Sequence, residues 1–356
     1  MLAFRYISFH YIKYFLVILT ALVMFLVGFD YMEQAEKLSD SVNLVLIYVV
    51  YKAFYAVDML LPLSLIFAMI TTKIFLIRSN ALVSFYSLGY SRIDVLRPFV
   101  VVSTLIITLY ISLHAWSSFA RADEYADNIK KNSEYLSSTR DLFFTYKDSY
   151  VYFSQMLPLQ EKAMGIRFFK IRDNSLQEVI VAKEASYENG YWLIKEADVI
   201  VKPQRLDFDS EGIRVDRMNN IEILHGFRPK ILDQVYEGKV NFTINDAFEA
   251  MLLLHDQNIN ITAIKGALYK IFIHPFFVPC MVVIIFFFVP ISPRFLNISL
   301  FSFGAILASL FTWGILFMLL ELSNNKTIPS EAGVIAPVVL LFVLALRQWR
   351  KYRLAS

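Results

Sequence analysis

Six long apolar segments constrain this chain more than any other feature. They cover residues 14–29, 58–77, 98–120, 269–290, 295–320 and 332–346. A helix needs about 20 mostly apolar residues to cross a bilayer, and the first and last segments reach that length only with flanking residues or a tilt. Charged residues make up 18% of the chain, against about 25% in soluble domains. The sequence therefore predicts an α-helical membrane protein with six transmembrane helices.

A shorter apolar stretch, residues 42–50, precedes the second segment, and Lys52 and Asp58 follow it. Charged side chains inside lipid are costly, so we interpret residues 41–57 as a separate helix at the interface or facing a cavity. The alternative is that this stretch begins one tilted helix of about 35 residues. Lys52 and Asp58 then either pair with each other or form a polar patch for a charged lipid head group.

The charged residues at the ends of the segments differ in sign. Basic residues gather at one set of ends: Arg5, Lys13, Lys73, Arg78, Arg92, Arg97, Arg294, Arg347, Arg350, Lys351 and Arg353. The opposite ends carry mostly acids: Asp30, Glu33, Glu36, Asp40, Glu321 and Glu331. Because cytoplasmic loops are enriched in Lys and Arg, this pattern predicts that both termini are cytoplasmic.

The residues between the third and fourth segments follow a different pattern of apolar and polar residues. Short runs of alternating apolar and polar residues lie between residues 149 and 243, with turn sequences such as Asn189-Gly190 between them. Seven or more short strands at this spacing are typical of a β-sandwich or jelly roll. We therefore expect three parts: helices one to three in 1–120, an extracytoplasmic β-jelly-roll domain in 121–262, and helices four to six with a basic tail in 263–356.

No motif of catalysis or nucleotide binding occurs in the chain. The patterns G-x-x-x-x-G-K-[ST], G-x-S-x-G and H-E-x-x-H are all missing. Cys280 is the only cysteine and the five histidines are far apart, so no metal site is expected. His114 and His274, inside spans, either make interhelical hydrogen bonds or line a polar pathway. The sequence His274-Pro275 favours a kink. The sequence predicts a protein that is not an enzyme, binds no cofactor and has no nucleic-acid partner.

One connection on the cytoplasmic side, residues 78–98, is long enough to be a docking surface. On a helix over 78–89, its apolar side chains gather on one side and its serines on the other. Gly89 is typical of a helix stop, and Ser91-x-x-Asp94 of a capping box. The segment is either a simple connector or a coupling helix that inserts into a partner. Its candidate docking residues are Arg78, Asn80, Leu82, Val83, Phe85, Tyr86, Gly89 and Arg92.

Four motifs resemble those of the LptF/LptG permeases of the lipopolysaccharide exporter. They are RYISFHYIK near the N-terminus, LLPLSLIFAMITTKIFLIRS in the second span, RSNALVSFYSLGYS after it, and IPSEAGVIAP before the sixth span. The order of three spans, a β-rich outer domain and three spans is also similar. The resemblance covers almost the whole chain, and RSNALVSFYSLGYS is its most specific part. The segment YMEQAEKL after the first span favours LptG over LptF.

This resemblance implies a half-transporter in the bacterial inner membrane. It implies pairing with a second LptF/LptG-type permease, and docking of a cytoplasmic LptB-type ABC ATPase dimer that uses ATP and Mg. Lipopolysaccharide is then passed to the jelly roll and on to a periplasmic bridge of LptC/LptA-type proteins. Two alternatives are a lipoprotein-release permease, against which the 3+3 span count argues, and a membrane-anchored scaffold without transport.

Departures from the family pattern concern charged positions. The family usually has Glu where this chain has Asn80, and a basic residue where it has Asp30. The resemblance implies that basic residues after the first and third spans meet lipid phosphates, and Lys52 is a possible replacement for those that are missing. For Lys130 and Lys131, after span three, the alternative is that they lie on a solvated helix face. The candidate lipopolysaccharide contacts are Lys37, Lys52, Lys130 and Lys131.

Overall fold

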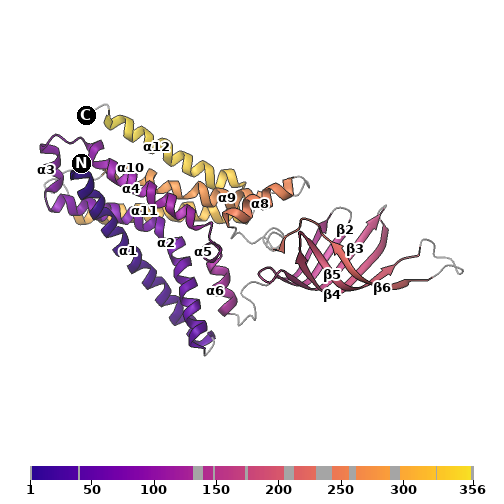
Figure 1. Ribbon diagram of the computed structural model, residues 1–356. Coiled ribbons are helices and arrows are strands. Elements are labelled where there is room, and N and C mark those ends of the chain that lie inside the picture. Colours follow the sequence, from indigo (N-terminus) through magenta and orange to yellow (C-terminus); the bar gives the residue numbers. More distant parts are fainter. Residues whose placement is uncertain are drawn as a thin grey trace. The chain divides into compact units, whose positions relative to one another are not determined.

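The computed structural model describes residues 2–38, 41–130, 139–146, 149–172, 175–203, 212–229, 243–255, 262–288, 297–325 and 327–353. The chain divides into two compact units. The membrane unit holds Met1–Ala126 and Lys265–Ser356, and the β-domain holds Asp127–Ile264. Figure 1 labels the helices and strands of both units.

Within the described residues, six helical segments are long and apolar enough to cross a bilayer. The first three are α1 (Leu2–Gln34), α2 (Val42–Arg78) and α4 (Arg92–Leu113). The last three are α9 with α10 (Thr262–Phe272 and Phe277–Phe288), α11 (Ile298–Asn324) and α12 (Ala336–Arg353). Short helices α3 (Ala81–Ser87), α5 (Ser117–Ala120) and α6 (Ala122–Lys130) adjoin the first three. The predicted 3+3 arrangement is confirmed.

Residues 42–57 form the first part of helix α2, and Ser41 is the residue that precedes it. Helix α2 is one continuous helix of 37 residues, which is about 55 Å long at 1.5 Å per residue. The hydrocarbon core of a bilayer is about 30 Å thick, so α2 extends well beyond that core or tilts strongly within it. The separate lead-in helix is therefore wrong, and the alternative of one long helix is confirmed.

Proline and glycine shape the second half of the membrane unit. Pro275 lies in a 3-10 turn, η2 (His274–Phe276), between α9 and α10; proline has no N–H for the helix ladder, and the predicted kink is confirmed. A π-helical turn, η4 (Glu331–Ile335), precedes α12 and packs against α11. A Cβ atom at Gly333 would lie 2.8 Å from the Leu319 carbonyl oxygen. Only glycine permits this close approach.

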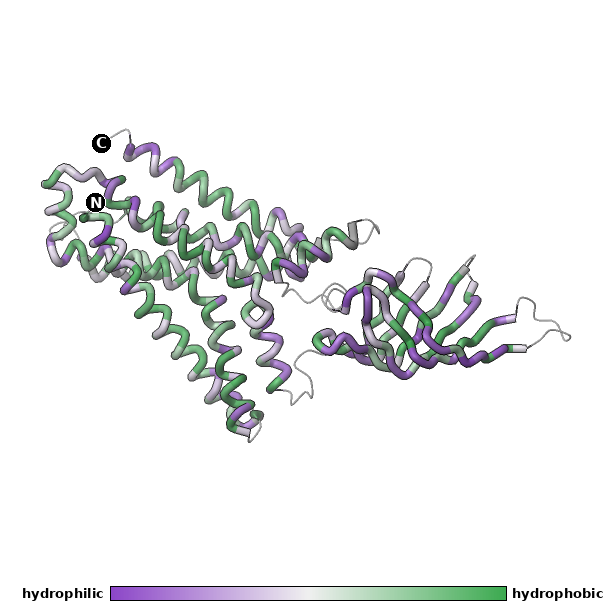
Figure 2. Tube along the Cα trace, viewed as in Figure 1, coloured by the Kyte–Doolittle hydropathy of each residue, from purple (hydrophilic) through white to green (hydrophobic). Residues whose placement is uncertain are grey.

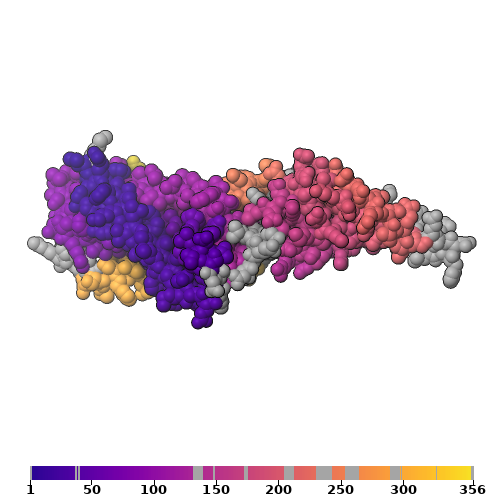
Figure 3. All heavy atoms as spheres, turned by 60° about the horizontal axis from the view of Figure 1, so that its bottom comes forward, coloured from indigo at the N-terminus to yellow at the C-terminus, as the bar shows by residue number. Residues whose placement is uncertain are grey.

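The buried core of the membrane unit lies mainly between α2, α4 and α10. Leu65, Phe99 and Phe286 are among its fully buried members, and the Tyr11 hydroxyl of α1 donates to the Leu65 carbonyl at 3.1 Å. Figure 2 shows hydrophobic residues along all of the long helices. On α1 and α11, however, most of them are exposed, and Figure 3 shows α1, in indigo, at the surface of the unit. These two helices supply outer apolar surfaces.

The β-domain is built on a six-stranded antiparallel sheet whose strands pair in sequence order (Figure 1). The strands are β1 (Thr139–Tyr146), β2 (Ser149–Leu157), β3 (Lys162–Arg172), β4 (Ser175–Glu188), β5 (Tyr191–Val201) and β6 (Arg214–Ile223). Helix α8 (Ile244–His255) follows the sheet. The predicted antiparallel β-domain between the third and fourth spans is confirmed. Its described strands form an up-and-down meander, without the Greek-key crossings of a two-sheet jelly roll.

One face of this sheet carries the core of the β-domain. Phe153 and Trp192 are fully buried there, and the Trp192 indole N–H donates to the Phe227 carbonyl at 2.8 Å. Asn189 and Gly190 join β4 to β5, both with positive φ, which is the conformation of a type I′ hairpin turn. The turn predicted at these two residues is confirmed, and it fixes which residues of β4 and β5 share the buried face.

Candidate functional site

Helix α3 lies inside the segment predicted to dock a partner. Gly89, at φ +87°, ends it, and the N–H groups of Gly89 and Tyr90 donate to the carbonyls of Tyr86 and Phe85, both at 3.1 Å. This Schellman pattern satisfies carbonyls left free at the helix end, and the predicted stop is confirmed. Before α3, Asn80 takes a left-handed φ of +57°, which Asn tolerates better than most residues. Both ends of α3 are thus held in fixed geometry.

The structure buries the side of α3 that the sequence predicted to contact a partner. Leu82 is fully buried in the core, and Phe85 and Tyr86 are half-buried against that core. Leu82 is therefore not available to a partner, and it must be removed from the candidate docking residues. Sequence periodicity grouped the apolar side chains but did not show that this group faces the other helices. The exposed side, which we name the docking face, consists of Val83, Ser84, Ser87 and Leu88.

Aromatic side chains hold the buried side of α3 in place. The ring of Tyr6, from α1, meets the Phe85 ring edge-on at 6.1 Å between centroids, and Phe85 also contacts Tyr90 at 6.0 Å. Burial raises the pKa of the Tyr86 hydroxyl to about 12, although the Arg92 guanidinium lowers it. Tyr86 is therefore neutral at physiological pH, so this side of α3 buries no charge from its own tyrosine.

The capping box predicted at the start of α4 is confirmed. The Asp94 N–H donates to the Ser91 hydroxyl oxygen at 3.2 Å, and the Ser91 N–H donates to the Asp94 carboxylate at 3.1 Å. Arg92 lies over the Tyr352 ring at 5.4 Å, and that ring stacks on Phe287 at 4.3 Å. The start of α4 is therefore connected through these side chains to α10 and α12.

Lys73 is a buried lysine at the same end of the membrane unit. From the sequence it was expected only to be one of the basic residues at that set of span ends. Its ammonium group donates to the Phe286 carbonyl and lies 3.7 Å from the centre of the Phe286 ring. These contacts join α2 to α10. A lysine inside an apolar segment that also begins a basic cluster was the one signal in the sequence for this role.

Toward the other end of α2, Lys52 is buried between two carboxylates. Its ammonium nitrogen lies 3.0 Å from Asp123 and 3.9 Å from Asp30, and Asp30 also accepts a hydrogen bond from the Tyr48 hydroxyl at 2.5 Å. A lysine is almost never fully buried unless it is paired. Neither carboxylate is that of Asp58, so the predicted ion pair between Lys52 and Asp58 is wrong.

Asp58 has partners of its own on α4. The Tyr110 hydroxyl donates to its carboxylate at 2.7 Å, and His114 Nε2 lies 3.0 Å from the same oxygen. The interhelical hydrogen bond predicted for His114 is therefore confirmed, and it joins α2 to α4. His274 differs, because its Nε2 atom is buried with no hydrogen-bond partner among the described residues.

The other candidate lipid contacts are placed only in part. Lys130 is half-buried at the end of α6. Lys37 lies in the 3-10 turn η1 (Ala35–Lys37), but its side chain is outside the described part of the structure. Lys131 lies wholly outside the described residues. Their roles as lipopolysaccharide contacts stay predictions.

Helices α1 and α11 expose continuous apolar faces. On α11, the small residues Gly304, Ala308 and Gly314 line a shallow groove together with Phe311 and other large side chains. Small residues allow the backbones of membrane helices to approach closely, so this face suits a second helix. On α1 the exposed apolar residues include Leu16, Val17, Met24, Phe25 and Phe29.

The lysine at position 52 provides a test of the buried ion pairs. Replacing it by Met leaves Asp30 and Asp123 without their cation, and we expect a loss of about 2 kcal/mol of stability, below the full cost for fully buried pairs because both carboxylates are partly exposed. Thermal unfolding of the full chain in detergent measures this loss. The control, Lys52→Arg, keeps the charge and should unfold near the wild-type temperature. Equal unfolding temperatures for Lys52→Met and wild type would contradict the pairing.

The chain matches a protein-family model over nearly its whole length. The family is described as "Lipopolysaccharide export system permease LptF/LptG", and the match covers residues 5–351. A search of the curated proteins gives no match. Among the described residues, no three His, Cys, Asp or Glu side chains are placed to hold a metal ion. Permeases of this kind are non-catalytic transmembrane subunits of an ABC exporter. The chain therefore belongs to the LptF/LptG family, the permeases of the lipopolysaccharide export system.

Proposed function

We propose that this permease receives the work of ATP hydrolysis from a separate cytoplasmic ABC ATPase dimer of the LptB type, bound at the docking face of α3. The observation that carries the proposal is α3 itself. Its ends are fixed by the Schellman pattern at Gly89 and by the bend at Asn80, while Val83 and Leu88 are exposed at 43% and 74%. A force on α3 is then passed to the rest of the membrane unit, because Leu82 is buried in its core and Phe85 packs against Tyr6 of α1. ATP and Mg belong to the partner, and no cofactor is expected on this chain.

The distribution of charge supports a cytoplasmic position for α3. Arg78, Arg92 and Arg97 flank this helix, and α12 ends with further basic residues. Figure 1 shows the start of α1 and the end of α12 at the same end of the membrane unit as α3. Because Lys and Arg are enriched on the cytoplasmic side, both termini are cytoplasmic in this proposal. The β-domain is then periplasmic, and the chain lies in the bacterial inner membrane.

The exposed faces of α1 and α11 support pairing with a second LptF/LptG-type permease. The segment YMEQAEKL favours LptG for this chain, which makes an LptF-type chain the partner. Lipopolysaccharide enters between the paired permeases, where the apolar faces accept its acyl chains. Closure of the ATPase dimer draws the two coupling helices together, narrows this space and moves the lipid toward the β-domain.

The sheet of the β-domain supports transfer to a periplasmic bridge of LptC/LptA-type proteins. Among the described strands, β1 and β6 form its two edges, and β6 exposes Val215 and Met218. The free backbone groups of an edge strand can pair with a strand from another protein. The buried face, which includes Phe153 and Trp192, offers acyl chains an apolar path when the sheet opens.

Substitution of Val83 tests the docking face. The variant Val83→Asp places a carboxylate in the contact, and we expect at least about a tenfold loss of copurifying ATPase, equivalent to about 1.4 kcal/mol. Val83→Thr has nearly the same volume and is the control, which should retain the ATPase. Leu82→Asp is unsuitable because Leu82 is fully buried. An ATPase that stays bound to folded Val83→Asp would show that the docking face is elsewhere.

Asn80 permits a separation of backbone conformation from contact. Its side chain makes no capping hydrogen bond, so we expect its role to be the left-handed φ. Asn80→Gly should then keep both the ATPase and the thermal stability, since glycine adopts positive φ freely. Asn80→Val should lower stability by about 1–2 kcal/mol, because a left-handed conformation is unfavourable with a Cβ branch. Loss of the ATPase from Asn80→Gly, measured by copurification, would instead identify a side-chain contact.

A further inference from the structure

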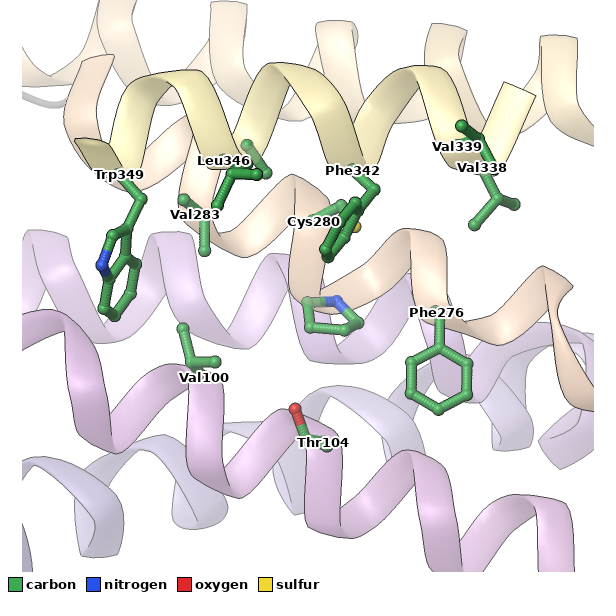
Figure 4. Close-up of a pocket in the computed structure, with 12 residues that line it drawn as sticks. Val100, Thr104, Phe276, Cys280, Val283, Val338, Val339, Phe342, Leu346 and Trp349 are labelled. Carbon is green, nitrogen blue, oxygen red and sulfur yellow. The ribbon is translucent and has the colours of Figure 1, made fainter. Parts of the chain in front are cut away.

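An apolar groove lies on the membrane unit between α4, α10 and α12 (Figure 4). Its volume is about 430 Å³, and its lining residues come from these helices and the turn η2. Val100 and Thr104 of α4 lie on one side, Val283 of α10 at the base, and Phe342 and Trp349 of α12 on the other side. Among the described residues, none that lines the groove comes from α1 or α11, so the groove is separate from the surface proposed for the second permease and the transported lipid.

The chemistry of the lining selects an apolar occupant. Nine of the twelve lining side chains are hydrocarbon. Phe342 and Val339 are more than half exposed, at 57% and 51%. Water in such a groove would find too few polar partners to be stable, and an empty groove would forfeit dispersion contacts. The groove lies on helices that cross the membrane, so the apolar groups around it are lipid acyl chains.

The groove has a basic end. Arg97 precedes Val100 by three residues and Thr104 by seven, so it lies on the groove-lining side of α4. Arg353 follows Trp349 by four residues and lies on the groove-lining side of α12. Arg97 is 63% exposed, with Asp94 at 3.1 Å as one neighbour, and Arg353 is exposed in the last turn of α12. Two guanidinium groups therefore stand at the end of the groove that Trp349 marks.

We propose that this groove binds an anionic glycerophospholipid, with one acyl chain between α4 and α12 and the phosphate at Arg97 and Arg353. Guanidinium groups bind phosphate oxygens through paired hydrogen bonds, and basic pockets between spans are typical sites for anionic head groups. Trp349 lies between the apolar and basic parts, where tryptophan is enriched at membrane interfaces. The lipid bridges α4, which begins at the capping box beside α3, to α12.

Two other occupants fit the groove less well. A transmembrane helix about 10 Å wide and 30 Å long occupies roughly 2,400 Å³, several times the volume of the groove. Lipopolysaccharide carries many acyl chains, whereas the groove accommodates little more than one. In the orientation proposed above, this phospholipid lies in the cytoplasmic leaflet, but its binding in the groove does not depend on that orientation.

Native mass spectrometry of the full chain, purified with its partner subunits in mild detergent, tests this proposal. The complex is titrated with phosphatidylglycerol and, separately, with phosphatidylethanolamine. Val339→Trp fills the groove, and Val343→Trp is the matched control, because Val343 is a similarly exposed valine of α12 outside the lining. We expect Val339→Trp to lose bound phosphatidylglycerol by about fivefold or more and Val343→Trp to stay within about twofold of wild type. Val339→Phe serves as a smaller filler if the Trp variant does not fold.

A second pair of variants tests the head-group contact. The double variant Arg97→Gln with Arg353→Gln should abolish the preference for phosphatidylglycerol over phosphatidylethanolamine. Arg347→Gln, on another side of α12, should keep it. Wild-type binding by the filled groove, equal losses in both Trp variants, an unchanged preference in the double variant, or displacement of the phospholipid by added lipopolysaccharide would each overturn the proposal. If the ATPase does not copurify with the wild-type chain, that result counts against the proposed coupling function. It does not change the measurement of bound phospholipid.

Discussion

The hydrocarbon of the membrane, which offers no hydrogen bonds, is the constraint on which the rest of this structure depends. Backbone groups inside it must be satisfied within helices, and the six long helices meet that requirement. Charged side chains inside it must find partners, and three in the interior of α2 do so. Lys52 lies between Asp30 and Asp123. Asp58 contacts Tyr110 and His114, and Lys73 donates to the Phe286 carbonyl. These contacts join α2 to its neighbours at both ends, so α2 is the element that holds the membrane unit together.

A chain with this arrangement works mechanically. Short helix α3 is held between α2 and α4 by backbone hydrogen bonds at Gly89 and by the Ser91–Asp94 capping box. Arg92 and Tyr352 extend that connection to α12. The well-packed helices α2 and α10 contrast with α1 and α11, whose apolar faces are exposed. In the proposed function, the packed helices transmit motion from α3, and the exposed helices meet the partner permease and the lipid.

Features encoded by neighbouring residues could be predicted from the sequence, while those set by packing could not. Segment length gave the six spans, and local turn chemistry gave the Gly89 stop, the capping box and the break at Pro275. The partners of Lys52 lie on α1 and α6, far along the chain, so the nearby Asp58 was the wrong choice. Burial of Leu82 and the strand β1, absent from the predicted strands, likewise depend on contacts that periodicity does not contain.

In the proposed function, work done by a separate ATPase reaches the lipid through α3. ATP-dependent release of lipopolysaccharide from proteoliposomes that contain the assembled exporter measures this most directly, with Val83→Asp compared with Val83→Thr. We expect that Val83→Thr supports release, while Val83→Asp abolishes release and retains lipopolysaccharide in the membrane-embedded complex. Release by Val83→Asp at the rate of Val83→Thr would contradict it.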